Sequence, residues 1–122
     1  MNLNQVTVAA VDMPESIAFY QALGLRLIVG SEHYSRFECP EGDATFSVHL
    51  AEKVGPSSTL IYFEVEDLVA TVEALKALGF EFAKEPTEER WLWRESRLFD
   101  PAGNQICIYT AGANRKYPPW RV

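Results

Sequence analysis

The chain has 122 residues, of which 11 are basic and 17 acidic, so its formal net charge is −6 at pH 7. A chain of this length forms one domain or two small halves that share a core, and 48% hydrophobic residues exclude intrinsic disorder. The acidic balance offers no cluster of Lys and Arg for a phosphate backbone or an anionic lipid surface. We therefore expect neither nucleic acid nor a membrane as a partner.

The sequence also carries no targeting signal that we recognise. Residues 1–5 lack the basic residues and apolar run of a signal peptide, and no stretch has the ~18 apolar residues of a membrane span. Cys39 and Cys107 are too few and too far apart for a disulfide framework or a CxxC zinc site. These features predict a cytoplasmic protein.

The chain repeats itself at an offset of 55 residues, the separation of Asp12 and Asp67. The segment Ala22-Leu23-Gly24 recurs at this offset as Ala77-Leu78-Gly79. Such self-similarity is typical of a fold built from two copies of one structural unit.

The first copy begins with a strand signal over residues 5–11, followed by an acidic residue that can cap a helix. Asp12 and Glu15 have the spacing of a capping box, and apolar residues then recur at helical spacing. Gly24 follows where a helix commonly ends in the left-handed conformation. Strand-like stretches come next, at residues 25–29, 34–39 and 45–51.

The second copy has the same order. A strand signal over residues 60–65 precedes Asp67, which can cap a helix that ends at Gly79. The strand-like stretches that follow are residues 81–83, 91–99 and 105–110, separated by turn signals. Each copy is therefore predicted to form a βαβββ unit.

Alternation of side chains along the strands predicts that one face packs on a helix while the other is semi-polar. A solvated second face would explain the pattern of any single strand. Taken together, however, these faces are rich in aromatic rings and short hydroxyls and nearly free of Lys, which favours a pocket shared by the two copies. Trp91 belongs to this face, and the residues expected to bind a ligand are Thr7, Ser47, His49, Tyr62, Trp93, Glu95, Arg97 and Tyr109.

The fold class predicted from these elements is α+β, with two βαβββ units forming a curved mixed sheet around a cavity. We expect one domain over residues 1–112, with repeats at about 3–52 and 58–111. Residues 113–122 form a C-terminal tail that either stays solvated or docks through Trp120.

Two segments carry a family resemblance: residues 11–24, and the turn Asp100-Pro101-Ala102-Gly103-Asn104 before the last strand. With the repeated βαβββ pattern, they make the chain resemble the vicinal oxygen chelate superfamily. That superfamily includes glyoxalase I, extradiol dioxygenases, fosfomycin-resistance enzymes and bleomycin-resistance proteins. The resemblance implies the fold, whereas one fold hosts unrelated activities.

The resemblance also implies where a metal would lie. Enzymes of the superfamily hold a divalent metal on the first and last strands of each unit, at positions that fall on Gln5, His49, Leu60 and Cys107. Leu60 has no donor atom, and an amide such as Gln5 is a weak ligand for first-row metals. We therefore expect no metal cofactor; if a metal is present, Gln5, His49 and Cys107 are its protein ligands, with water in the fourth position.

Glu95, Arg97 and His49 are the candidates for catalysis. Glu95 and Arg97 share a strand face, so they form either a structural ion pair or a ligand site in which Arg97 orients an oxyanion and Glu95 binds a cation or acts as a base. His49 is a ligand, a base or a hydrogen-bonded wall residue. Cys107 packs in the wall or, beside Arg97, acts as a nucleophile.

Two functions follow from these residues and the resemblance. The first is a protein with a degenerate metal site that binds a small aromatic or cationic molecule, similar in logic to bleomycin-resistance proteins. The alternative is a metal-dependent lyase, isomerase or dioxygenase acting on adjacent substrate oxygens, with Glu64 or Glu95 moving the proton. The resemblance further implies a homodimer.

Overall fold

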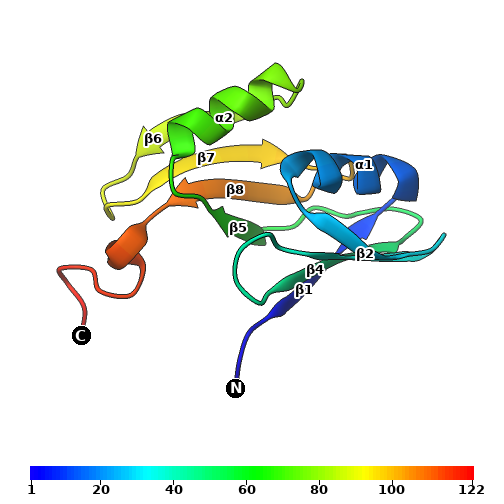
Figure 1. The fold of residues 1–122 in the computed structure, drawn as a ribbon, viewed down its shortest axis with the longest axis horizontal. Coiled ribbons are helices and arrows are strands. Elements are labelled where there is room, and N and C mark those ends of the chain that lie inside the picture. The colour runs from blue at the N-terminus through cyan, green and yellow to red at the C-terminus, as the bar shows by residue number, and fades with distance from the viewer. The chain divides into compact units, whose positions relative to one another are not determined.

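The computed structural model describes residues 1–122, which divide into two compact units (Figure 1). The first unit comprises residues 1–57 together with 100–104, and the second comprises residues 58–99 together with 105–122. Each unit contains one copy of the repeat. No helix of the chain is long and apolar enough to span a bilayer.

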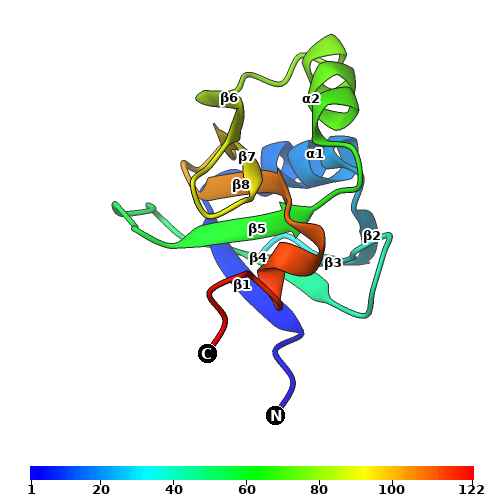
Figure 2. The ribbon, with the colours of Figure 1, turned by 90° about the vertical axis from the view of Figure 1, so that its left-hand side faces the viewer.

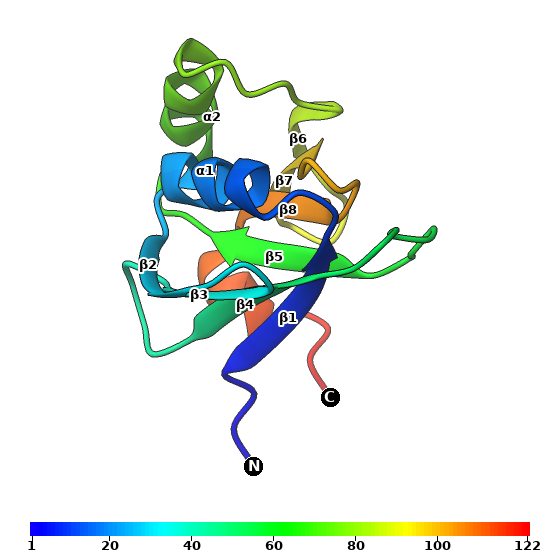
Figure 3. The same ribbon diagram turned by 90° about the vertical axis from the view of Figure 1, so that its right-hand side faces the viewer.

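The first unit forms a four-stranded mixed sheet with one helix. Its strands lie in the order β1-β4-β3-β2, with β1 parallel to β4 and the other pairs antiparallel (Figure 3). The elements are β1 (Gln5–Ala10), α1 (Met13–Leu23), β2 (Arg26–Gly30), β3 (Tyr34–Glu38) and β4 (Thr45–Leu50).

Helix α1 packs through an aromatic core on one face of this sheet. The ring of Tyr20 lies 4.6 Å from that of Phe46 and 5.8 Å from that of Phe37, centroid to centroid. All three side chains are buried, so they anchor the helix to β3 and β4. The opposite face of the sheet carries the polar side chains that alternate with the apolar ones along the strands.

The ends of α1 form as its sequence predicts. The Asp12 side chain accepts a hydrogen bond from the N–H of Glu15, which satisfies one of the free donors at the helix start. Gly24 ends the helix at φ +115°, in the left-handed region that glycine adopts without steric cost.

The second unit repeats this architecture. Its strands lie in the order β5-β8-β7-β6, with β5 parallel to β8 and the other pairs antiparallel. Asp67 caps α2 as Asp12 caps α1. The elements are β5 (Leu60–Glu64), α2 (Leu68–Ala77), β6 (Lys84–Glu88), β7 (Arg94–Phe99), β8 (Gln105–Thr110) and the short 3-10 helix η1 (Gly112–Arg115). The α+β class and the two βαβββ units are thus confirmed.

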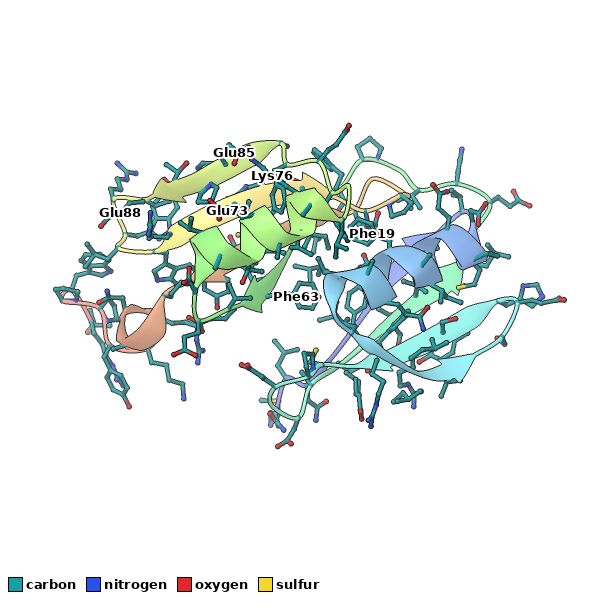
Figure 4. The ribbon with its side chains drawn as sticks, turned by 45° about the horizontal axis from the view of Figure 1, so that its top comes forward. Phe19, Phe63, Glu73, Lys76, Glu85 and Glu88 are labelled. Carbon is teal, nitrogen blue, oxygen red and sulfur yellow. The ribbon has the colours of Figure 1, made fainter.

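Helix α2 covers one face of the second sheet through Leu68, Val72 and Leu75, which are all buried. On its outer side Lys76 pairs with Glu85 of β6, and Figure 4 shows these two side chains between the helix and the edge strand. Both side chains are exposed to solvent, so this ion pair contributes little to stability.

The predicted strand over residues 81–83 is wrong. The third strand of the second unit is instead β6, at residues 84–88, and it lies at the edge of the sheet. It contains Pro86 and several charged residues, a composition that resembles a loop in sequence. An edge strand tolerates proline because one side of its backbone needs no partner in the sheet.

The predicted strand over residues 91–99 begins three residues too early, because β7 starts at Arg94. Trp91 and Trp93 lie in the turn that joins β6 to β7. The N–H of Glu89 donates to the carbonyl of Trp93 over 2.7 Å, and Leu92 lies in the left-handed region at φ +68°. That conformation is uncommon for a bulky residue and does not follow from an alternating pattern.

Candidate functional site

The second sheet presents a semi-polar face opposite α2. Strand pairing places Tyr62, Cys107, Arg97 and Lys84 side by side across all four strands. The adjacent row runs through Glu64, Tyr109, Glu95 and Thr87. Six of the predicted site residues, Tyr62, Trp93, Glu95, Arg97, Cys107 and Tyr109, thus belong to one face or its border.

Three rings on this face form what we call the aromatic cluster: Tyr62, Trp93 and Tyr109. Trp93 stacks on Tyr109 with ring centroids 4.9 Å apart, and Tyr62 meets both rings edge to face at 6.0 and 5.3 Å. Tyr109 is buried, whereas Tyr62 keeps 42% of its surface exposed. The cluster therefore presents the partly exposed ring of Tyr62 beside the buried ring of Tyr109.

Glu95 lies buried beside the cluster with only 1% of its surface exposed. One carboxylate oxygen accepts the indole N–H of Trp91 over 3.0 Å, and the other pairs with Nη2 of Arg97 over 3.0 Å. Trp91 thus reaches the predicted face although it lies outside β7. Arg97 remains partly exposed, and its buried Nε has no hydrogen-bond partner.

The charge on Glu95 acts on the aromatic cluster. Burial raises the pKa of Tyr62, and the Glu95 carboxylate raises it further, while Arg97 opposes the shift more weakly. The negative field of Glu95 at this ring therefore exceeds the positive field of Arg97.

Cys107 is fully buried in the middle of this face, packed with Tyr109, Ala111 and Trp93. Burial, followed by the nearby Glu95 carboxylate, raises the pKa of its thiol to about 12. The thiol is therefore protonated near neutral pH, and a protonated thiol is a poor nucleophile.

Glu64 holds the start of the C-terminal tail. Its Oε2 accepts the backbone N–H groups of Ala111 and Gly112 over 2.8 and 2.9 Å, and its Oε1 faces Arg115 at 3.5 Å. Figure 2 shows η1 and the tail following directly from the end of β8. Glu64, which the sequence analysis offered as a possible proton carrier, thus anchors the segment that follows β8.

The first sheet presents a hydroxyl-rich face opposite α1. Ser47 is fully buried and accepts a 2.7 Å hydrogen bond from Nε2 of Gln5, while Thr7 and His49 are exposed. Tyr34 and Arg36 of β3 share this face, because strand pairing places them opposite His49 and Ser47. Sequence reasoning missed these two residues, although the alternation over residues 34–38 would have placed them here.

A cleft of about 450 Å³ lies elsewhere, next to the start of α2. It is lined by Glu66, Asp67, Leu68, Arg94 and Thr110. None of the predicted site residues borders it.

The sequence model of the Glyoxalase/Bleomycin resistance protein/Dioxygenase superfamily matches residues 2–108. The chain belongs to this superfamily. The match covers the first βαβββ unit and the second as far as residue 108, inside β8.

Solved structures of the superfamily have the same fold. A glyoxalase/bleomycin resistance protein/dioxygenase from Nocardioides is 18% identical, with a TM-score of 0.79 over 100% of this chain and 89% of that chain. Lactoylglutathione lyase from Agrobacterium tumefaciens is 16% identical, with a TM-score of 0.74 over 89% and 92% of the two chains. A bleomycin-binding protein in complex with bleomycin is 17% identical, with a TM-score of 0.73 over 90% and 98%.

These identities are too low to carry an activity from one superfamily member to another. No curated protein sequence matches this one. The activity must therefore be argued from the residues of this chain.

Of the four positions that the resemblance gives for a metal, three carry side chains poorly suited to hold one, and His49 is the exception. The Gln5 amide is engaged on both sides, since its Oε1 accepts the Thr45 hydroxyl and its Nε2 donates to Ser47. Leu60 has no lone pair, and burial raises the pKa of the Cys107 thiol to about 12, so a metal bound there would have to displace a firmly held proton. No three His, Cys, Asp or Glu side chains gather as they would around one ion.

Proposed function

We propose that this superfamily member binds a small aromatic molecule, cationic in preference to anionic, on the aromatic cluster of the second unit and without a metal ion. The observation that carries the proposal is the ordered packing of Tyr62, Trp93 and Tyr109, with Tyr62 left accessible. A planar ligand gains stacking and edge-to-face contacts on such a surface at little cost in side-chain entropy.

The preference for a cation rests on charge. The faces of aromatic rings attract cations, and the field of Glu95 at Tyr62 outweighs that of Arg97. The net charge of −6 adds a weak long-range attraction for a positive ligand. Arg97 and Glu95 act here as a positioned ion pair beside the rings. Thr7, Ser47 and His49, which the sequence also predicted to bind a ligand, lie on the polar face of the first unit and take no part in this proposal.

A series of three ligands with one ring and different charges tests this proposal: benzyltrimethylammonium, benzyl alcohol and benzoate. The readout is the indole N–H signal of Trp93 in ¹⁵N-labelled protein, assigned through Trp93→Leu, with the exposed Trp120 as internal reference. We expect the cation to shift the Trp93 signal at the lowest concentration and benzoate at the highest.

Tyr62→Leu provides the matched variant, because the side chain is exposed enough for the fold to tolerate the change. It should weaken binding of the cation about tenfold, the loss expected from one cation–π contact. Tyr117→Leu, which removes an exposed ring of the tail, should leave the affinity unchanged. A Trp93 signal that no probe moves, or affinity for the cation that survives Tyr62→Leu, contradicts the proposal.

The metal-dependent lyase, isomerase or dioxygenase is the second candidate, and it requires an ion that the donor groups do not favour. Metal analysis of protein purified without chelators separates the two. Close to one metal ion per chain would overturn the metal-free proposal, whereas metal well below that ratio supports it.

We also propose that the protein acts as a cytoplasmic homodimer. The edge strand β2 leaves Ile28 and Val29 about half exposed, and an apolar edge strand is stabilised by being covered. Light scattering of the purified chain tests the assembly. A monomer that persists as the concentration rises contradicts it.

A further inference from the structure

Polar side chains of the first unit are joined by hydrogen bonds that converge on the phenol of Tyr34. The Thr45 hydroxyl donates to Oε1 of Gln5, and Nε2 of Gln5 donates to Oγ of Ser47 over 2.7 Å. Ser47 Oγ lies 2.8 Å from the Tyr34 hydroxyl, and Nε of Arg36 donates to that hydroxyl over 2.9 Å. The chain of bonds crosses three strands, β1, β4 and β3.

The direction of the bond between Ser47 and Tyr34 follows from burial. Ser47 is fully buried and already accepts from Gln5, so its own proton needs an acceptor, and the Tyr34 oxygen is the acceptor within reach. A buried hydroxyl proton without a partner would be costly. Ser47 therefore donates to Tyr34, and the Tyr34 oxygen receives two hydrogen bonds, from Ser47 and Arg36.

This arrangement leaves the proton of Tyr34 without an acceptor inside the protein. Tyr34 is half-buried, so its hydroxyl proton can point to a ligand. The two donated bonds also lower the pKa of Tyr34, with the bond from Ser47 first and that from Arg36 second. A phenol polarised in this way donates a stronger hydrogen bond to an anionic oxygen.

The charge on this face favours an anion. Arg26 forms an ion pair with Glu38, so those two charges compensate each other. Arg36 forms no ion pair, and its guanidinium carbon lies 5.5 Å from the centroid of the Tyr34 ring. With Nε held by Tyr34, the terminal nitrogens of Arg36 remain available to the same ligand.

We propose that Tyr34 and Arg36 form a binding site for the oxyanion of a small ligand, such as a carboxylate, with the phenol proton donated to one oxygen and the guanidinium facing the charge. Preorganised donors of this kind stabilise negative charge on oxygen better than water does, because their orientation is already fixed. The site belongs to the first unit alone and does not depend on the aromatic cluster.

Acetate and its neutral isostere acetamide are the probes. Protein labelled with ¹³C at the Cζ of tyrosine reports on each phenol separately, and Tyr34→Phe assigns the Tyr34 signal. We expect acetate to shift the Tyr34 signal in a saturable manner, with acetamide binding at least about tenfold more weakly because it carries no charge. Tyr117 serves as the internal reference, since Arg121 lies over its ring without a bond to its hydroxyl.

Arg36→Met should weaken acetate binding about tenfold or more, whereas Arg90→Met, which removes the same charge from an exposed turn of the second unit, should not. Tyr62→Leu should leave the acetate titration unchanged, so failure of this site and failure of the aromatic cluster are distinguishable. The proposal is overturned if the Tyr34 signal moves no more than that of Tyr117, or if Arg36→Met binds acetate as tightly as the unaltered protein.

Discussion

The hydroxyl of Tyr20, on α1, donates a 2.6 Å hydrogen bond to Oδ2 of Asp100, a residue 80 positions later in the chain. Both side chains are buried. Oδ1 of Asp100 accepts the backbone N–H groups of Ala102 and Asn104. The side-chain amide of Asn104 donates to Oδ2 of Asp100 and to the backbone carbonyl of Ala9. One buried polar network therefore joins α1, β1 and the turn over residues 100–104 within the first unit.

Removing the hydroxyl with Tyr20→Phe should destabilise the protein by about 1–3 kcal/mol, because one oxygen of the buried Asp100 loses a donor while the ring still packs on Phe37 and Phe46. Urea unfolding followed by circular dichroism measures the change. Tyr117→Phe removes a hydroxyl from an exposed ring and should change the free energy of unfolding by less than about 0.5 kcal/mol. Equal effects of the two variants would show that the buried bond contributes nothing.

The repeat and its helices could be predicted because their signals are local. Asp12 and Asp67 cap the helices, and Gly24 ends α1 in the left-handed region, as the sequence indicates. Each signal acts within one turn of helix, so no knowledge of the rest of the chain is needed.

The region from residue 81 to 93 could not be predicted, because its structure depends on distant partners. Pro86 and its charged neighbours become a strand only by pairing with β7, and Leu92 adopts φ +68° only because the β6–β7 turn requires it. The alternation of Trp91 and Trp93 therefore predicted a strand at residues where the backbone forms a turn.

For the candidate sites, the sequence predicted which side chains share a face but not how they bond. Alternation placed Glu95 and Arg97 on one face, and they do form an ion pair. The convergence of Ser47 and Arg36 on Tyr34 depends on strand register and side-chain rotamers, which no single segment encodes.

Removing one partner of the ion pair between Glu95 and Arg97 should lower the free energy of unfolding more than replacing both partners does. Arg97→Met leaves the buried Glu95 carboxylate with Trp91 as its remaining hydrogen-bond donor and should cost about 2–3 kcal/mol. This is less than for a fully buried pair, because the Arg97 side chain is 31% exposed.

The double variant Glu95→Gln with Arg97→Met should recover most of that loss, since no unpaired charge remains in the interior. Thermal unfolding of both single variants and the double variant completes the cycle. Additive losses in the double variant would mean that the two residues do not stabilise each other.

Cys107 should resist alkylation in the folded protein. Its pKa of about 12 leaves almost no thiolate at pH 8, and the side chain is fully buried. Iodoacetamide at pH 8 should therefore modify Cys39, which is only half-buried, well before Cys107, as peptide mass spectrometry would detect. Modification of Cys107 at the rate found in the unfolded chain would contradict this prediction.

The same raised pKa has a consequence in alkaline solution. The folded state holds the thiol proton more tightly than the unfolded state, whose pKa is 9.0, so this stabilisation is present below pH 9 and is lost as the pH rises towards about 12. The free energy of unfolding should fall less steeply over this range in Cys107→Ala than in the unaltered protein. Parallel pH profiles would show that Cys107 does not titrate differently in the two states.

Glu64 should control how firmly the C-terminal segment is held, because its Oε2 accepts the N–H groups of both Ala111 and Gly112. In Glu64→Ala these amides should exchange with solvent at least about tenfold faster, as expected when bonds to a charged acceptor are lost. Glu64→Gln keeps one acceptor oxygen, so its exchange rates should lie between those of the unaltered protein and those of Glu64→Ala. Glu66→Ala removes an exposed carboxylate two residues away and should leave exchange at Ala111 unchanged. Faster exchange at Ala111 in both alanine variants would indicate a general loss of stability instead of release of this segment.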